Sequence, residues 1–318
     1  PLHLACAAYE KLIALDEDLL GEANRVRAAS GEEVPPLHYR RGKLVYYGPY
    51  PHARLSLRGL GNNRIVLKDG LGKRLGVSDL ASALRELHPG AVYLHQGENY
   101  LVRNLDLDAG VAVLLPHLQD YYTQARSVTD IDILEHEATH YGVSVGRVRV
   151  STDVTSYVRK RYYSEAVLDE TVLMLPELSY PTQALWFAVS EVMGAVHPSL
   201  LPAAIHALEH TLIGLLPVFV LCERADVGGV SYPLYPATGQ PTIFIYDGYP
   251  GGVGYTRAGS LVFREWLTAA RDLLGACPCK EGCPRCVLSP KCGNGNQYLD
   301  KGAALALAEA LLARLEGV

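Results

Sequence analysis

The sequence predicts an α+β protein in which a β-rich N-terminal part is followed by a mainly helical domain. Three observations predict this class. Short β-rich runs bounded by turn residues occupy most of 37–175. Helix-periodic segments dominate from 176 onward. Five of the seven cysteines fall between 277 and 292, which indicates a metal site within the helical part.

Length and composition set the expected number of domains. A chain of 318 residues with 49% hydrophobic and 20% charged residues can bury a sizeable core and has room for two or three domains. We expect boundaries near 36/37 and 175/176. They would separate a helical linker (1–36), a β-rich accessory domain (37–175) and a helical domain around the cysteines (176–318).

The first elements are a helix and a series of strands. Residues 2–30 are compatible with a helix, because apolar residues recur at helical spacing from Leu4 to Leu15. One helix interrupts the strands, roughly from Asp79 to Leu87, with Ser78 or Asp79 as its cap. The expected strands lie at 43–47, 64–68, 91–95, 100–103, 130–134 and 143–150.

The later elements are mainly helices. Thr182 can cap a helix that runs to about Ala195, and Pro198 opens a second that runs to about Leu216. The remaining elements are a buried strand over 242–247, a helix over 260–274, and a last helix from 300 to about 315 that Asp300 caps.

The cysteine cluster is the strongest chemical signal. Thiolates bind zinc in a tetrahedral cage, and short spacings let one compact loop converge on a single ion. Four thiolates would close the shell, so the site would be structural. We favour four ligands and keep Cys292 as the alternative ligand: Cys277, Cys279, Cys283 and Cys286. An iron–sulfur cluster or a redox pair are the other interpretations of this spacing.

Two histidine motifs resemble metalloprotease signatures. His136-Glu-Ala-Thr-His140 matches H-E-x-x-H, but it lies between strand-like segments and has little room for the helix that this chemistry requires. The inverted form, His206-Ala-Leu-Glu209-His210, does lie on a predicted helix. A metal site and a buried polar network are both open there, and we favour the network.

Two aspartates belong to the same expected set of structural polar residues. Asp247 lies at the start of a glycine-rich loop, Tyr246–Gly254, which follows a predicted strand. Such loops can cradle phosphate, but no Lys-Ser/Thr follows, and close backbone packing anchored by Asp247 is the favoured interpretation. Asp226, which precedes Gly228 and Gly229, is interpreted in the same way.

Charge limits the possible partners. The net charge of −5 and the pI of about 6.1 exclude a strongly basic nucleic-acid binder, so any such contact must come from a local basic face. Cations that alternate on a strand or alternate with tyrosines would suit phosphate contact and base stacking. The candidates are Arg54, Arg58, Arg147, Arg149, Arg159, Lys160 and Arg161, with ordinary solvated surface as the other interpretation.

Location follows from the apolar pattern and the thiols. No secretory signal opens the chain, and the longest apolar stretch, 212–222, contains Pro217 and is too short to cross a bilayer. Cysteines clustered in this way in a large chain favour metal over disulfides. We therefore expect a cytoplasmic protein with no membrane partner.

Several segments together resemble a known family. They are 206–210, 222–229, 242–254 and 277–296, the last of which ends in Cys-Gly-Asn-Gly-Asn, with weaker upstream likeness at 3–10 and 87–98. The combination resembles the C-terminal half of superfamily 2 DEAD/DEAH-box DNA helicases of the mitomycin-repair (MrfA-like) type, including their zinc-binding C-terminal domain. The resemblance covers nearly the whole chain.

The resemblance implies an ATP-dependent 3′–5′ DNA helicase that acts in repair, with single-stranded DNA as the expected partner. Residues 1–36 would then link to a preceding motor domain. This sequence has neither a G-x-x-x-x-G-K-[ST] loop nor a D-E-x-H box, so ATP and Mg²⁺ would bind only in that motor. We expect no ATP hydrolysis from this chain alone. A metallohydrolase using a His/Glu/His site and a structural docking module for a separate motor subunit are the alternatives.

Overall fold

The structure is a computed structural model that describes residues 2–30, 34–54 and 64–316. The chain divides into two compact units, Pro1–Asn63 and Arg64–Val318. This division differs from the expected boundaries at 36/37 and 175/176.

The first unit contains two short helices and a small sheet. The expected continuous helix over 2–30 is wrong, because β1 (Ile13–Ala14) separates α1 (Leu2–Glu10) from α2 (Gly21–Ala29). Ile13 pairs with Leu44 of β3 (Lys43–Val45), and both side chains are buried in one core with Leu4 and Ala28. Because this pairing joins the helices to the strands, no boundary falls at residue 36. The strand β2 (His38–Arg40) completes the sheet.

The second unit begins with a five-stranded sheet of order β5-β4-β8-β7-β6. The predicted helix after Asp79 is confirmed as α3 (Leu80–Glu86). Asp79 caps it, because its carboxylate accepts from Ser82 N at 3.0 Å and Ser82 Oγ at 2.8 Å. The strands are β4 (Arg64–Asp69), β5 (Arg74–Asp79), β6 (Val92–His95), β7 (Glu98–Asp106) and β8 (Val111–Pro116).

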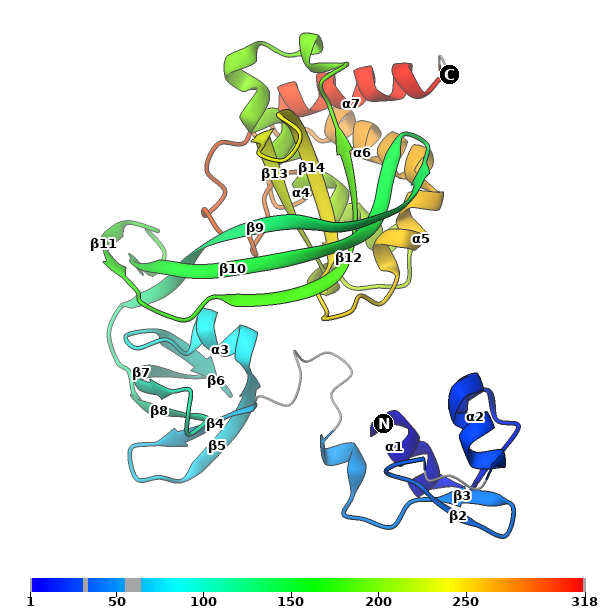
Figure 1. Cartoon of the computed structure of the whole chain (residues 1–318). Helices are drawn as coiled ribbons and strands as arrows, with labels where there is room; N and C mark the ends of the chain where they lie inside the picture. The colour runs from blue at the N-terminus through cyan, green and yellow to red at the C-terminus, as the bar shows by residue number, and fades with distance from the viewer. Residues whose placement is uncertain (1, 31–33, 55–63, 317–318) are drawn as a thin grey trace. The chain divides into compact units, whose positions relative to one another are not determined.

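A long hairpin leads from this small sheet into a larger one (Figure 1). It consists of β9 (Tyr121–His140) and β10 (Val143–Arg161), which pair along almost their whole length and turn at Tyr141-Gly142. Both turn residues have positive φ, 48° and 75°, as the tight hairpin requires. β10 also pairs with β11 (Val167–Val172) near one end and with β12 (Leu178–Ala188) near the other.

The expected helix from Thr182 to Ala195 is wrong, because this segment forms β12. Ala184 and Trp186 pack in a core on one face of the sheet, whereas Leu185 and Phe187 pack in a core on the other. A strand buried on both faces has a continuous apolar run in its sequence, which short windows do not distinguish from a helix. Because β12 pairs with β10, residue 176 is not a boundary either.

Two further strands and four helices complete the unit, and the α+β class is confirmed. The helices form a layer on the face of the large sheet where Leu185 and Phe187 point (Figure 1). The elements are β13 (Val227–Tyr235), β14 (Gln240–Asp247), α4 (Leu201–Phe219), α5 (Tyr255–Leu261), α6 (Phe263–Ala276) and α7 (Lys301–Glu316).

The central helix of this layer is α4, which the chain enters through a short turn at Pro198–Leu200, as Pro198 predicts. By length and composition alone the segment Pro198–Phe219 would suffice to cross a membrane. Within this unit 56% of an apolar 18-residue stretch of this segment is buried, and α4 packs against α6, α7 and β13. A core helix accounts for its apolar character.

Candidate metal centre

Four cysteines converge in the loop between α6 and α7. Cys277 ends α6, and the other three follow within nine residues. The Sγ–Sγ distances are 3.5 Å for Cys277–Cys279, 3.6 Å for Cys277–Cys283, 3.4 Å for Cys279–Cys286 and 3.7 Å for Cys283–Cys286. We call this group the four-cysteine cluster.

These distances fit a tetrahedral metal. Four sulfurs at about 2.3 Å from a central zinc lie about 3.8 Å from one another, close to the observed separations. All seven cysteines of the chain are free thiols, so no disulfide competes for the cluster. With four sulfur ligands the shell is closed, and the site can hold structure but offers no position for a reacting water.

Neighbouring backbone N–H groups and one lysine contact the cysteines of the cluster. Cys283 N donates to Cys286 Sγ at 3.3 Å, and the Arg285 backbone N–H lowers the pKa of Cys283 to about 7. Such contacts favour thiolate, the form that binds metal, although burial raises the pKa of Cys286 to about 12. Lys301 Nζ, in the first turn of α7, donates to the carbonyl oxygens of Cys277 at 2.6 Å and Cys279 at 2.7 Å. The cluster therefore joins the end of α6 to the start of α7.

The C-terminal end of the cysteine loop, at Cys286 and Val287, also contacts the middle of α4. Thr211 Oγ1 donates to the carbonyl of Cys286 at 3.3 Å, and His210 Nδ1 lies 2.7 Å from the carbonyl oxygen of Val287. Because a carbonyl only accepts, Nδ1 carries the proton of that imidazole. Three helices of the layer thus meet at one loop.

Cys292 lies outside the four-cysteine cluster, beside the second histidine motif. Its Sγ is 3.6 Å from Nε2 of His206, and these two residues and His210 bring one ligand atom each to within 4.8 Å of one another. Burial raises the pKa of Cys292 and lowers that of His206. Burial also lowers the pKa of His210, to about 4, so both imidazoles are neutral at neutral pH. Cys292 is therefore not placed to replace one of the four favoured ligands.

Glu209, between the two histidines in sequence, lies apart from them. Its side chain is fully buried, and burial raises its pKa to about 8, although a hydrogen bond from Ser231 acts in the opposite direction. It belongs to neither group of converging ligand atoms among the described residues. The arrangement does not place a His/Glu/His set around one ion.

The two aspartates organise loops around their own carboxylates. Asp247 Oδ2 accepts from the N–H groups of Val253 at 2.7 Å and Gly254 at 2.6 Å, and Asp247 Oδ1 accepts from Thr256 N at 2.9 Å. The N–H groups of the glycine-rich loop thus already hold an anion that belongs to the chain. Asp226 accepts from Glu223 N at 2.7 Å and from the Tyr249 hydroxyl.

The H-E-x-x-H motif lies near the end of β9, not on a helix. His136 Nε2 contacts Thr139 Oγ1 at 3.0 Å, and Glu137 forms an ion pair with Arg257 of α5. His136 and His140 are absent from the converging ligand groups found among the described residues. A metalloprotease site is not formed there.

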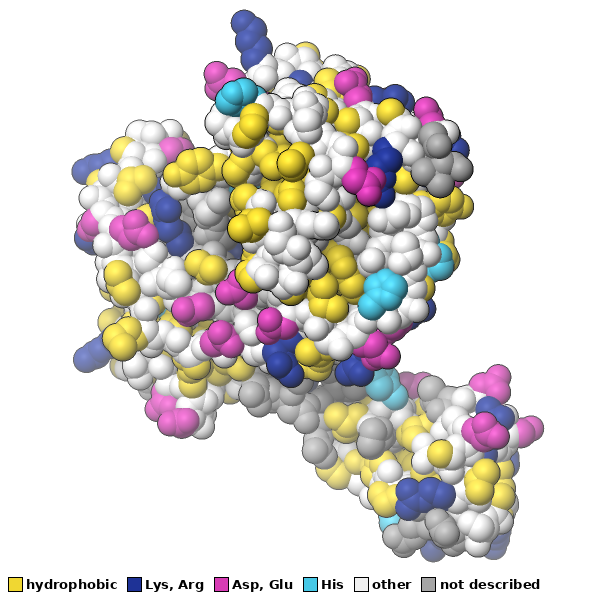
Figure 2. All heavy atoms as spheres, turned by 45° about the horizontal axis from the view of Figure 1, so that its top comes forward, with side chains coloured by type: hydrophobic (Ala, Val, Ile, Leu, Met, Phe, Trp, Pro, Cys, Tyr) yellow, Lys and Arg dark blue, Asp and Glu magenta, His cyan; other side chains and the backbone are white. Residues whose placement is uncertain are grey.

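The candidate DNA-contacting cations lie mostly on β10, and most of them face carboxylates. Arg159 pairs with Asp169 and lies over the Tyr121 ring, 5.2 Å from its centroid. Lys160 approaches Glu165 at 3.8 Å, and Arg161 contacts Asp120 at 2.6 Å. On the face that Figure 2 shows, Lys and Arg side chains are scattered, several beside Asp or Glu.

Arg147 and Arg149 are the exception. Both are exposed on one side of β10, opposite the buried Val148 and Val150. Arg147 is 3.7 Å from Glu135, a distance at the edge of an ion pair, and Arg149 has no side-chain partner among the described residues. The Arg54 side chain and the whole of Arg58 lie outside the described residues, so their predicted role stays a prediction.

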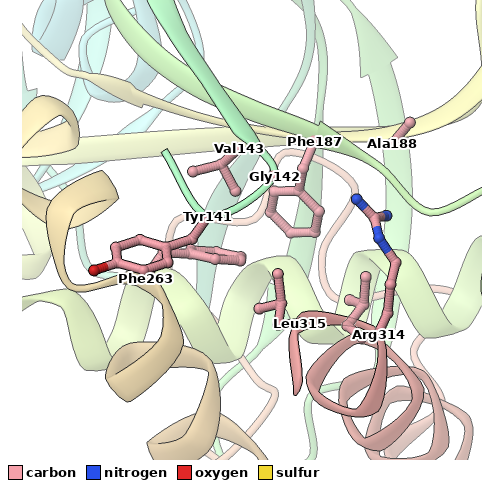
Figure 3. Close-up of a pocket in the computed structure, with 9 residues that line it drawn as sticks. Tyr141, Gly142, Val143, Phe187, Ala188, Phe263, Arg314 and Leu315 are labelled. Carbon is pink, nitrogen blue, oxygen red and sulfur yellow. The ribbon is translucent and has the colours of Figure 1, made fainter. Parts of the chain in front are cut away.

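A shallow pocket lies at the turn of the long hairpin (Figure 3). Its walls come from the turn residues Tyr141 and Gly142, from Phe187 of β12, from Phe263 of α6, and from the end of α7. Arg314, the charged residue of the lining, is bound to Glu191 at 3.0 Å. Apart from the Arg314 guanidinium and the Tyr141 hydroxyl, the side chains that line it are apolar.

Two features of the metal region are absent from the sequence-based expectations. Lys301 over the ligand carbonyls had no signal beyond its place in the first turn of a helix. The pairing of Cys292 with His206 had a partial signal in the sequence. One cysteine is left over from the four-cysteine cluster and two histidines lie at i, i+4 spacing, which together are three residues of the kind that bind metal. The sequence does not show that the loop folds back onto α4.

Comparison with known proteins identifies relatives of this region and of the whole chain. A family model described as the MrfA Zn-binding domain matches residues 208–287, a span that contains the four-cysteine cluster and ends before Cys292. Protein MJ1572.1 of Methanocaldococcus jannaschii is 36% identical over 110 residues, which are 34% of this chain and 98% of that protein.

Two longer relatives cover nearly the full chain. The ATP-dependent helicase YprA of Bacillus subtilis is 30% identical over 296 residues, 90% of this chain and 39% of YprA. A crystal structure of the DUF1998 helicase MrfA bound to DNA matches with a TM-score of 0.60 and 28% identity, covering 98% of this chain and 42% of that one. The chain thus spans about two fifths of the length of these relatives.

Proposed function

We infer that this chain, which belongs to the MrfA family of helicases and matches their C-terminal part, serves as the DNA-contacting and zinc-binding region of an ATP-dependent DNA repair helicase. The observation that carries the proposal is the four-cysteine cluster, which lies inside the matched zinc-binding domain and has the spacing of a tetrahedral zinc site. Structural similarity along the whole chain to a helicase bound to DNA supports the DNA contact.

In such a helicase, ATP binding and DNA contact would lie in different regions of the full-length protein. ATP and Mg²⁺ would bind in motor domains that precede this region in the full-length protein, because no phosphate-binding loop with its lysine occurs in this sequence. Zinc would hold the helical layer together, and the long hairpin would present cations to DNA. We expect the DNA to be single-stranded and the protein to be cytoplasmic, in keeping with its seven free thiols.

The DNA contact predicts which cations matter. Arg159 and Arg161 are already neutralised by carboxylates, whereas both Arg147 and Arg149 are exposed. Arg147 is weakly paired with Glu135, and Arg149 has no side-chain partner among the described residues. The double variant R147A/R149A should weaken single-stranded DNA binding about tenfold at low salt. It should also reduce the slope of log K against log salt by about 1 to 2, because two phosphate contacts are lost. Fluorescence anisotropy over a salt series measures both quantities.

A matched control separates local contact from net charge. R264A/R271A removes the same charge from α6, where the two arginines pair with Glu316 and Asp272. This variant should bind as wild type does. Equal losses in both variants would assign the effect to net charge, and no DNA binding by metal-loaded wild type would favour the docking-module alternative. The triple variant R159A/K160A/R161A should lose less per charge than R147A/R149A.

A further inference from the structure

A second set of metal-type ligands lies next to the four-cysteine cluster. It consists of His206 and His210, one turn apart on α4, and Cys292 in the loop that leads to α7. Sulfur and imidazole nitrogen suit zinc and its close transition-metal neighbours. We call this set the His2Cys triad.

The separation between the sulfur and nitrogen atoms fits a shared ion. Cys292 Sγ lies 3.6 Å from His206 Nε2. Nitrogen and sulfur bound tetrahedrally to one zinc, at about 2.0 and 2.3 Å, lie about 3.6 Å apart. The two imidazole rings meet edge to face with centroids 4.4 Å apart, so both can turn a nitrogen toward the same point.

Both histidines are held by their other nitrogen. Nδ1 of His206 lies 3.2 Å from the carbonyl of Tyr298, and Nδ1 of His210 lies 2.7 Å from that of Val287. These carbonyls fix the proton on Nδ1 and leave each Nε2 as a lone-pair donor. Metal-binding histidines are oriented by such outer contacts. The contacts therefore set both rings for coordination.

Cys292 lies in a loop that several hydrogen bonds hold in place. Lys291, its neighbour, donates to the carbonyls of Ala225 at 2.8 Å and Val227 at 3.4 Å. Asn296 bonds the backbone of Ser289 on both sides, at 2.7 Å and 2.9 Å. The Cys292 thiol also contacts Asn294 Oδ1 at 2.8 Å. The sulfur consequently faces His206 from a fixed backbone.

We propose that the His2Cys triad is a second metal site that binds one Zn²⁺-class ion through His206 Nε2, His210 Nε2 and Cys292 Sγ. It leaves one coordination position free for water or a further ligand, unlike the closed four-cysteine cluster. Glu209 is not a ligand, because its carboxylate is directed into the core toward Ser231 and Gly229. The ion would fasten the 287–298 loop to α4.

The competing explanation is a plain hydrogen bond between a thiol and an imidazole. Metal stoichiometry separates the two. The full chain is produced with zinc, freed of loosely bound ions and assayed by elemental analysis. Wild type should hold two zinc ions per chain and C292S one. The control C222S, which changes a half-buried thiol outside both clusters, should hold two.

Substitution of zinc by cobalt separates the loss of the second metal from unfolding of the variant. In C292S the absorption of the four-sulfur cobalt site should persist, which shows that the chain is folded, while the second cobalt is lost. H206N should lose the same ion. One metal per wild-type chain, bound by sulfur alone, would overturn the proposal, as would two metals retained in both C292S and H206N.

Discussion

One buried side chain, His88, predicts how the stability of this protein depends on pH. His88 is only 1% exposed and packs against Tyr157, with the ring centroids 4.6 Å apart and the rings tilted by 33°. Burial lowers its pKa, despite the opposing contact with the carbonyl of Pro89. The folded state thus prefers the neutral ring. Its contribution to stability is complete above pH 6.5 and is lost as the pH falls through the folded-state pKa.

Because the pKa of His88 is lowered in the folded state, the H88F variant should lose less stability in acid than wild type does. The variant keeps an aromatic ring against Tyr157 but cannot take up a proton. Between pH 7.5 and pH 5, wild type should lose on the order of 1 kcal/mol more unfolding free energy than H88F does. Urea unfolding at each pH measures the difference. The exposed His136, changed to Phe, should leave the pH profile unaltered, and a wild-type profile parallel to that of H88F would refute the assignment.

At the scale of elements, the N-terminus of α7 is tied to the metal loop by one lysine. Lys301 donates to the carbonyls of Cys277 and Cys279, the first two residues of the four-cysteine cluster along the chain. K301M should lower zinc affinity by about tenfold, because an outer contact that orients the ligands is lost. Competition with a chromophoric chelator gives the affinity.

The K280M variant tests whether loss of a positive charge alone lowers zinc affinity. Lys280 lies inside the cysteine loop, so its loss removes the same charge from the same region. Its zinc affinity should stay within about twofold of wild type. If K280M and K301M weaken zinc equally, electrostatics and not ligand orientation would be responsible.

Elements with strong local signals are predictable from the sequence, and those defined by distant partners are not. Asp79 and Asp300 cap helices as expected, since an N-cap acts within its own turn. β12 resembles a helix in sequence because its two-faced burial depends on β10 and β14. The four-cysteine cluster is predictable because its members lie within ten residues of one another in the sequence. The approach of Cys292 to His206 joins residues 86 apart and has no local signature.

At the scale of the whole molecule, each unit has a core of its own. The first buries Leu4, Ile13 and Leu44 together, and the cores of the second contain only residues after 64. Residues 64–318 alone should therefore fold and bind zinc with the stoichiometry of the full chain. Circular dichroism and elemental analysis test this. An unfolded or metal-free product would show that residues 1–63 are required.

The expected boundaries fail for a reason that belongs to this scale. They rest on the change between strand-like and helix-like segments, but strands β12 and β14 lie under helices in one layered unit. A change in local pattern marks a change of element and not a gap between cores.

The long hairpin restricts how the second unit can bend. A hinge requires backbone that rotates without loss of ladder bonds, and β9 and β10 are paired from Tyr121 to His140. The register between them shifts at three places, Val145/Gly146, Arg147/Val148 and Val154/Ser156. Bulges are where a ladder is locally interrupted. Two of these steps flank Arg147, where β10 is also paired with β12. Any flexing between the small sheet and the helical layer would therefore concentrate at the third step, Val154/Ser156.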